Sequence, residues 1–157
     1  MTRVLETTRF GRLEVTSEAV VYFPKGLPGF EDHYEWVVAG EDENPIKWLQ
    51  SVKDEDVALP VVSSLLIEKN YDPALSSEDL EALGGDAHKL TVMVVVTIPP
   101  AAPWDMTANL RAPIVVNHEE RMAKQVISGN EAYEVRTPVL PQSVRDLMRK
   151  QAVGGES

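Results

Sequence analysis

The chain contains no cysteine among its 157 residues. This absence excludes a disulfide framework, a thiolate metal site and a cysteine nucleophile, and it is typical of proteins in a reducing compartment. Long apolar runs are also lacking, since the longest, Val92 to Ile98, is far shorter than the about 20 residues that span a bilayer. The first residues, Met1 to Glu6, contain no apolar run of the kind found in a signal peptide. We therefore expect a cytoplasmic protein that does not enter a membrane.

Aromatic residues and clustered bases are scarce. Aromatics make up 6% of the chain, whereas modules that bind single-stranded nucleic acid stack the bases on aromatic side chains in a basic groove. Arg3, Arg9 and Arg12, near the start of the chain, do not form a dense patch. We therefore expect no direct binding of nucleic acid.

Negative charge is concentrated in one part of the chain. The net charge is −10, and the segment 31–86 holds fifteen acids and three bases, whereas the rest of the chain has ten acids and twelve bases. A field of this sign repels phosphate backbones and attracts basic proteins. The same charge also keeps a protein soluble, and composition alone favours neither interpretation.

The sequence lacks the motifs of common enzymes. A nucleophile elbow, a phosphate-binding loop and a dinucleotide fingerprint are all absent. His33, His88 and His118 have no second histidine at metal-ligand spacing, and the run Asn117 to Glu120 is typical of a hairpin turn. We expect no enzyme activity, no metal and no cofactor. A small metal-dependent hydrolase and a nucleic-acid-binding barrel are the alternatives.

Strand signals dominate the residues that are present. The strongest is Leu90 to Ile98, which is apolar on both faces and therefore indicates a central, buried strand. Other segments rich in β-branched and aromatic residues predict strands at 11–15, 19–23, 34–39, 46–52, 57–62, 107–110, 113–116, 122–127 and 133–136. So many short strands predict a mainly β fold, a small antiparallel β-barrel-like single domain. We expect this domain to span 1–140, and 141–157 to form a helix and a flexible tail.

One or two short helices are expected, at about 76–83 and 142–151. Ser76 is a suitable N-cap because Asp79 follows three residues later, and a glycine pair ends the segment. In the second segment, apolar residues recur on one helical face and bases lie near its end.

The loop from Phe23 to Asp32 is built for a defined shape. Its rigidity is expected from three residues: Gly26, Pro28 and Gly29. Leu27 and Phe30 then need burial, either within the domain or against a partner.

Two later segments combine strand patterns with polar residues. Alternation along Trp48 to Ser51 puts Trp48 and Gln50 on one face of a strand. Asn109 and Asn117 lie in strand-like segments around Pro113, and each is expected to tie a turn or bulge to the backbone.

Together these segments resemble the FliW family of flagellar assembly factors. The resemblance covers most of the chain between residues 10 and 137. It rests on segments in the family's order and at about its spacing, namely Phe23 to Asp32, Trp48 to Ser51, Val94 to Pro99, Thr107 to Asn117 and Lys124 to Ile127. The chain departs from the family pattern at Ser63-Ser64, where the family usually has an acidic residue and a proline.

The resemblance implies a β-barrel-like protein with two protein partners in the cytoplasm. One partner is flagellin, which the family holds as a chaperone before export. The other is CsrA, a translational repressor of flagellin messenger RNA, whose repression FliW relieves. Flagellin bound to FliW leaves CsrA free to repress. We expect a free chain of this kind to be a monomer.

The charge pattern agrees with this partner switch, because a repressor that binds RNA needs a basic surface. Our hypothesis is that the acidic residues supply the electrostatic field and the apolar loop residues supply contact area. The candidate partner-binding residues are Leu27, Phe30, Glu31, Asp32, Glu41, Asp42, Glu43, Trp48, Gln50, Asp54, Glu55 and Asp56.

Overall fold

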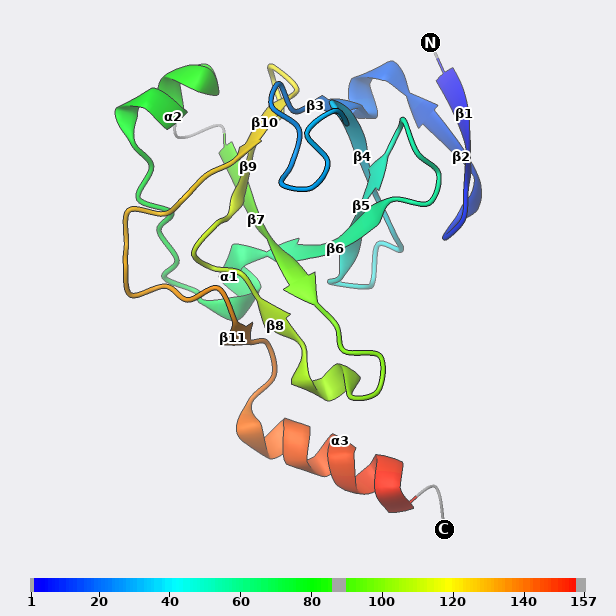
Figure 1. Ribbon diagram of the computed structural model, residues 1–157, viewed down its shortest axis with the longest axis vertical. Helices are drawn as coiled ribbons and strands as arrows, with labels where there is room; N and C mark the ends of the chain where they lie inside the picture. Colours follow the sequence, from blue (N-terminus) through cyan, green and yellow to red (C-terminus); the bar gives the residue numbers. More distant parts are fainter. Residues whose placement is uncertain (1, 86–89, 155–157) are drawn as a thin grey trace.

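Seven strands close into a barrel in the computed structural model, which describes residues 2–85 and 90–154. Around the ring the neighbours run β7, β6, β5, β4, β3, β10, β9 and back to β7 (Figure 1). In that order the strands span Leu90–Thr97, Ala58–Ser63, Lys47–Ser51, Glu35–Ala39, Val21–Tyr22, Met122–Gln125 and Ile114–Asn117. The predicted mainly β, barrel-like fold is confirmed. Its pairings are antiparallel except for β3 with β10, which pair in parallel at Tyr22 and Met122 within the described residues.

A two-stranded hairpin lies outside this ring. Strand β1 (Thr2–Thr7) pairs antiparallel with β2 (Gly11–Thr16), and the hairpin stands beside β4 and β5 in Figure 1. A small apolar cluster from the hairpin and the barrel, which includes Leu5, Val15 and Val37, holds it there. On the other side, the short strands β8 (Thr107–Ala108) and β11 (Thr137–Pro138) extend the sheet beyond β7.

Strand β7 is central, as its apolar sequence predicts. Met93 and Val95 pack in the main core with Trp36, and the alternate residues Val94 and Val96 pack in a second cluster. Full burial of an aliphatic side chain stabilises the fold by roughly 1.5–3 kcal/mol. Both faces of β7 therefore contribute to folding, which explains why the strand has no polar face.

The helices are short, and the two expected from the sequence are present. Helix α2 (Ser77–Ala82) begins after Ser76, whose side chain accepts a hydrogen bond from the Asp79 amide at 3.1 Å. Helix α3 (Gln142–Gly154) runs three residues further than predicted and lies apart from the barrel in Figure 1. Of the expected flexible tail, residues 155–157 lie outside the described residues, as does His88.

Further elements of the structure were not expected. These are β1, helix α1 (Ser64–Ile67) and the 3-10 turns η1 (Ser17–Ala19) and η3 (Pro103–Asp105). Turn η1 takes the start of the predicted strand 19–23, so that β3 is only two residues long.

The predicted strand at 133–136 is wrong. The strand instead lies at β11, and the Tyr133 ring packs against Tyr71 with 4.5 Å between ring centroids. Tyr133 therefore satisfies its need for burial by an aromatic contact and not by a strand pairing.

Candidate partner-binding surface

The loop from Phe23 to Asp32 packs across the barrel core. Leu27 and Phe30 exchange two backbone hydrogen bonds of 3.3 and 2.7 Å, so the loop doubles back on itself. Gly26 has a φ of +62° and Gly29 a φ of +86°, both in the left-handed region that glycine adopts without strain. Leu27 is only 2% exposed and belongs to the main core. Its side chain therefore anchors the loop and offers no surface in this conformation, whereas Phe30 is half-buried.

Behind this loop, a network of hydrogen bonds fixes the turn between β5 and β6. The His33 Nδ1 lies 2.8 Å from the Ser51 Oγ, and both residues are buried. The same Ser51 oxygen accepts hydrogen bonds from the backbone amides of Lys53 and Asp54, each at 3.2 Å. The buried Ser51 side chain thus helps to fix the conformation of this turn.

Four of the candidate acidic residues meet at this end of β4 and β5. We call Asp32, Asp54, Glu55 and Asp56 the acidic end. Lys53 donates a hydrogen bond to Asp32 at 2.7 Å, and this bond lowers the pKa of that carboxyl. The Asp54 carboxylate accepts a hydrogen bond from the Asp56 amide at 2.9 Å. Three of the four residues are exposed and Asp54 is half-buried, so a partner can reach them.

Three more of the candidate acidic residues lie at the opposite end of the same two strands. Glu41, Asp42 and Glu43 follow β4. The antiparallel pairing of Trp36 with Ser51 and of Ala39 with Trp48 places them at the end of the strand pair that is opposite to the acidic end. At about 3.3 Å per residue, the length of β4 separates the two groups by about 15 Å. These candidate acids therefore form two separate patches in space and not one surface.

Trp48 and Gln50 lie on the outer face of β5, opposite Leu49, as strand alternation predicts. The Arg9 guanidinium lies over the Trp48 ring at 3.6 Å from its centroid. Gln50 is fully buried and donates from Nε2 to the backbone oxygens of Ser51 and Asp54 at 3.0 and 3.3 Å. These two side chains therefore support the hairpin and the turn, and Gln50 has no exposed surface.

The remaining candidates lie in well-ordered turns. Glu31 is exposed and its carboxylate accepts a hydrogen bond from the Gly29 amide at 3.1 Å. The Asn109 side chain accepts hydrogen bonds from two amides that precede the buried Pro113. Asn117 does the same for the amides of residues 119 and 120 in the turn between β9 and β10.

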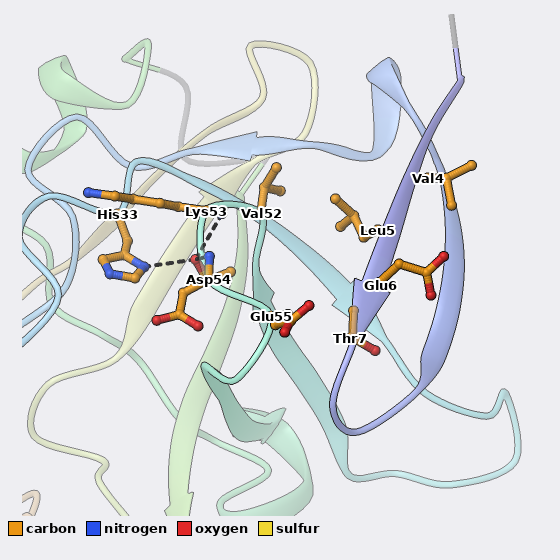
Figure 2. A pocket seen from close by; sticks show the side chains of 10 residues that line it. Val4, Leu5, Glu6, Thr7, His33, Val52, Lys53, Asp54 and Glu55 are labelled. Carbon is orange, nitrogen blue, oxygen red and sulfur yellow. Dashed lines mark hydrogen bonds between the residues drawn. The ribbon is translucent and has the colours of Figure 1, made fainter.

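Two grooves border these residues. The first, which we call the β1 slot, has a volume of about 400 Å³ and separates β1 from the acidic end (Figure 2). It is lined by Val4, Leu5, Glu6, Thr7, His33, Ser51, Val52, Lys53, Asp54 and Glu55. The second is a pair of adjoining hollows of about 390 and 530 Å³ that share Leu27, Pro28 and Gln125. The exposed apolar residues Ile127 and Val135 line the larger hollow.

The β1 strand is the part of this surface that the sequence analysis missed. Its residues, Thr2–Thr7, are mostly exposed, and only two of its side chains turn toward the body. The signal present in the sequence is Gly11, which follows the turn Thr8 to Phe10 and begins the second strand of the hairpin, where its φ is +65°.

Within residues 2–85 and 90–154, no group of three or more His, Asp or Glu side chains is arranged to hold a metal ion. His118 instead contacts the Thr91 hydroxyl at 2.9 Å. In the same described ranges, no helix has the length and apolar character needed to cross a membrane.

Comparisons with known proteins identify relatives over most of the chain. A family model described as "FliW protein" matches residues 4–139. The flagellar assembly factor FliW of Thermosipho africanus is 40% identical over 131 residues, which cover 82% of this chain and 90% of that protein. The protein of the same name from Leptospira interrogans is 34% identical over 145 residues, or 91% and 97% of the two chains. A crystal structure of the flagellar assembly factor FliW matches with a TM-score of 0.80 at 29% identity, over 89% of this chain and 99% of that one.

Proposed function

The chain belongs to the FliW family of flagellar assembly factors, and on this premise we propose that it is a cytoplasmic, non-enzymatic regulator that binds two proteins in alternation. One partner is a CsrA-type translational repressor, whose hold on flagellin messenger RNA this protein relieves. The other is flagellin, which it binds as a chaperone. When flagellin occupies the protein, the repressor is free, and export of flagellin reverses the exchange. The names of the relatives, which describe assembly factors, support a role in protein binding.

The observation that carries the proposal is the acidic end. Asp32, Asp54, Glu55 and Asp56 gather beside Lys53, and the Lys53 ammonium is already bound to Asp32. The uncompensated negative charge attracts a basic surface and repels phosphate. A repressor that binds RNA carries such a basic surface, so the acidic end is the part of this protein that we assign to it.

The test compares two triple substitutions that remove equal charge. One variant carries Asp54→Asn, Glu55→Gln and Asp56→Asn, and its matched control carries Glu41→Gln, Asp42→Asn and Glu43→Gln. Both keep side-chain oxygen acceptors, so the hydrogen bond from the Asp56 amide to residue 54 is retained. At low salt we expect the first variant to bind the repressor roughly tenfold more weakly and the control to change by less than about threefold.

The binding constants are measured by titration calorimetry at low and moderate salt, with RNA displacement followed in parallel. Added salt is expected to weaken binding of the repressor to the unmodified protein, because salt screens exposed charges. The difference in binding constant between this protein and the first variant should then become smaller. Equal effects of the two variants, or binding that ignores salt, would contradict the assignment. A competition between purified flagellin and the repressor then tests the proposed alternation, and simultaneous binding of both would refute it.

A further inference from the structure

Strand β1 has one edge that carries no partner strand. Among the described residues it pairs only with β2, and the backbone hydrogen bonds of Thr2–Thr7 to the rest of the protein run along that one edge. In an antiparallel pair, alternate residues direct their N–H and C=O groups away from the partner. Every second residue of β1 therefore presents an unpaired donor and acceptor at its other edge, the arrangement that binds an added strand.

The β1 slot lies along this unpaired edge. Four consecutive residues of β1, Val4 to Thr7, line it and none of β2 does, which places the slot at the side of the hairpin and not over one of its faces. The opposite wall is Val52 to Glu55, as Figure 2 shows. Four residues at about 3.3 Å each give a length of about 13 Å, enough to pair with three or four residues of an extended chain.

The ends of the slot are closed unequally. At one end the Thr8 amide donates a hydrogen bond to the Glu55 carbonyl oxygen at 3.1 Å, a backbone contact that continues the pattern of a strand pairing. At the other end, an exposed ion pair of 2.9 Å from Arg3 to Glu35 is the one ion pair of the described residues that crosses the gap. Exposed ion pairs contribute little to stability, so a chain can enter at the Arg3 end.

The chemistry of the slot selects the side chains of such a segment. Leu5 turns inward toward Val52 in Figure 2, and both are partly buried in the same apolar cluster. Glu6 lies on the opposite face of β1 by strand alternation, and Glu55 borders the far wall. Neither Glu6 nor Glu55 forms an ion pair within the described residues, whereas Lys53 is held by Asp32. A strand that alternates apolar and basic residues can place an apolar side chain against Leu5 and basic side chains near Glu6 and Glu55.

We propose that the β1 slot binds an extended segment of a partner protein by strand addition, with an apolar side chain against Leu5 and a lysine or arginine beside Glu6 and Glu55. The inference rests on the proposed function only in taking the ligand to be a polypeptide. The slot also continues into the acidic end through Asp54 and Glu55, so one partner can cover both.

The outer edge of β2 supplies an internal comparison. It borders a groove of about 570 Å³ lined by Leu13 to Thr16 and by Val37 to Glu41. None of the residues that line that groove is a base, but the groove lies away from the acidic end, beside Glu41. If edge pairing were unspecific, both edges of the hairpin would take up a strand.

The first experiment uses hydrogen exchange of the full chain with a synthetic probe, the capped peptide Lys-Val-Lys-Val-Lys at millimolar concentration. Every second amide of Val4–Thr7, those that face the open edge, is expected to exchange at least tenfold more slowly with the probe, and the amides of Gly11–Thr16 less than twofold more slowly. The matched peptide Glu-Val-Glu-Val-Glu is expected to give no protection. The inference would be overturned by protection of β2 alone, by equal effects of the two peptides, or by no protection at all. It would also be overturned if light scattering detected a dimer formed through β1 of two copies.

The second experiment compares Val4→Pro with Leu5→Pro. Proline removes one N–H donor, and because adjacent residues alternate in direction, one substitution breaks the β1–β2 pairing and the other removes a donor from the open edge. Hydrogen exchange of the unmodified chain identifies the open-edge position, because the unpaired amide exchanges faster, and the proline variant at that position is expected to bind the basic probe at least tenfold more weakly than the unmodified chain. Unchanged binding by that variant would overturn the inference. If the probe binds β1 while flagellin and the repressor do not bind the protein, the proposed function fails and the strand-addition site stands.

Discussion

The His33 imidazole and the Ser51 hydroxyl lie 2.8 Å apart, measured from Nδ1 to Oγ, and join two segments that are distant in the sequence. Because the Ser51 oxygen accepts hydrogen bonds from the amides of Lys53 and Asp54, its proton is donated to His33. This pair connects the loop before β4 to the turn after β5. The acidic end and one wall of the β1 slot thus share this buried support.

Replacement of Ser51 by alanine tests this support. Ser51→Ala removes the acceptor for two backbone amides and the donor to His33, and we expect a loss of about 2 kcal/mol in the free energy of unfolding. The measurement is urea denaturation followed by circular dichroism. Ser63→Ala is the control, because Ser63 is exposed and makes no side-chain capping bond, and it should cost less than about 0.5 kcal/mol. Equal losses in the two variants would contradict the role of Ser51.

Two glycines of the loop 23–32 are predicted to differ in their tolerance of a side chain. Both have positive φ, so alanine costs about 1 kcal/mol in backbone strain at either position. At Gly26 a Cβ would also collide with the Phe30 carbonyl oxygen, whereas nothing lies within 4 Å at Gly29. We therefore expect Gly26→Ala to lose about 3 kcal/mol or more and Gly29→Ala about 1 kcal/mol in thermal or urea unfolding. A smaller loss at Gly26 than at Gly29 would contradict this packing.

Asn117 is expected to stabilise the turn between β9 and β10 strongly. Its side chain is 3% exposed, donates a hydrogen bond to the Leu83 carbonyl oxygen and accepts two from turn amides. Asn117→Ala leaves buried polar groups unpaired, and we expect a loss of about 2–3 kcal/mol in the free energy of unfolding. The matched control is Asn130→Ala, an exposed turn asparagine with a similar local bond to the Ala132 amide, with a loss of about 0.5 kcal/mol. A control that loses as much as Asn117→Ala would show that burial is not the cause.

Because of Tyr71, the free energy of unfolding is expected to fall at alkaline pH. Burial raises the pKa of its hydroxyl from 10.0 to about 12, and the hydroxyl donates to the Leu110 carbonyl oxygen at 2.6 Å. The unfolded chain therefore ionises first, so the contribution of Tyr71 is complete below pH 10 and is lost as the pH rises toward 12. The slope is at most about 1.4 kcal/mol per pH unit.

The measurement is the free energy of unfolding between pH 9 and 12 for Tyr71→Phe, which should lack this part of the slope. Tyr34→Phe, at an exposed tyrosine, should keep it. An unchanged alkaline slope in Tyr71→Phe would contradict the assignment.

The barrel was predictable because its strands carry their own signals. Residues 90–98 carry apolar side chains on both faces of the strand, and the proline pair at 99 and 100 cannot continue a ladder. The cap of α2 was equally readable, since the bond between Ser76 and Asp79 depends on residues three apart. The strand at 133–136 was not predictable, because the partner that fixes Tyr133 is Tyr71, which lies far away in the sequence.

The candidate site was only partly predictable, for the same reason. The acidic residue types and the rigid loop are visible in the sequence, but the division of the acids into two groups follows from the pairing of β4 with β5. Gln50 is polar and Leu27 lies in a loop, and both features are typical of exposed positions. Only the folded chain shows that both side chains are buried.

By itself the sequence determined the composition of the strands, the excess of negative charge and the places where the chain must turn, because each of these depends on neighbouring residues. The tertiary structure alone decided which acids lie together, which apolar side chains serve the core and which strand edge stays open. Those outcomes depend on contacts between residues that are not neighbours in the sequence, such as Thr8 with Glu55 and His33 with Ser51, and local patterns carry no information about them.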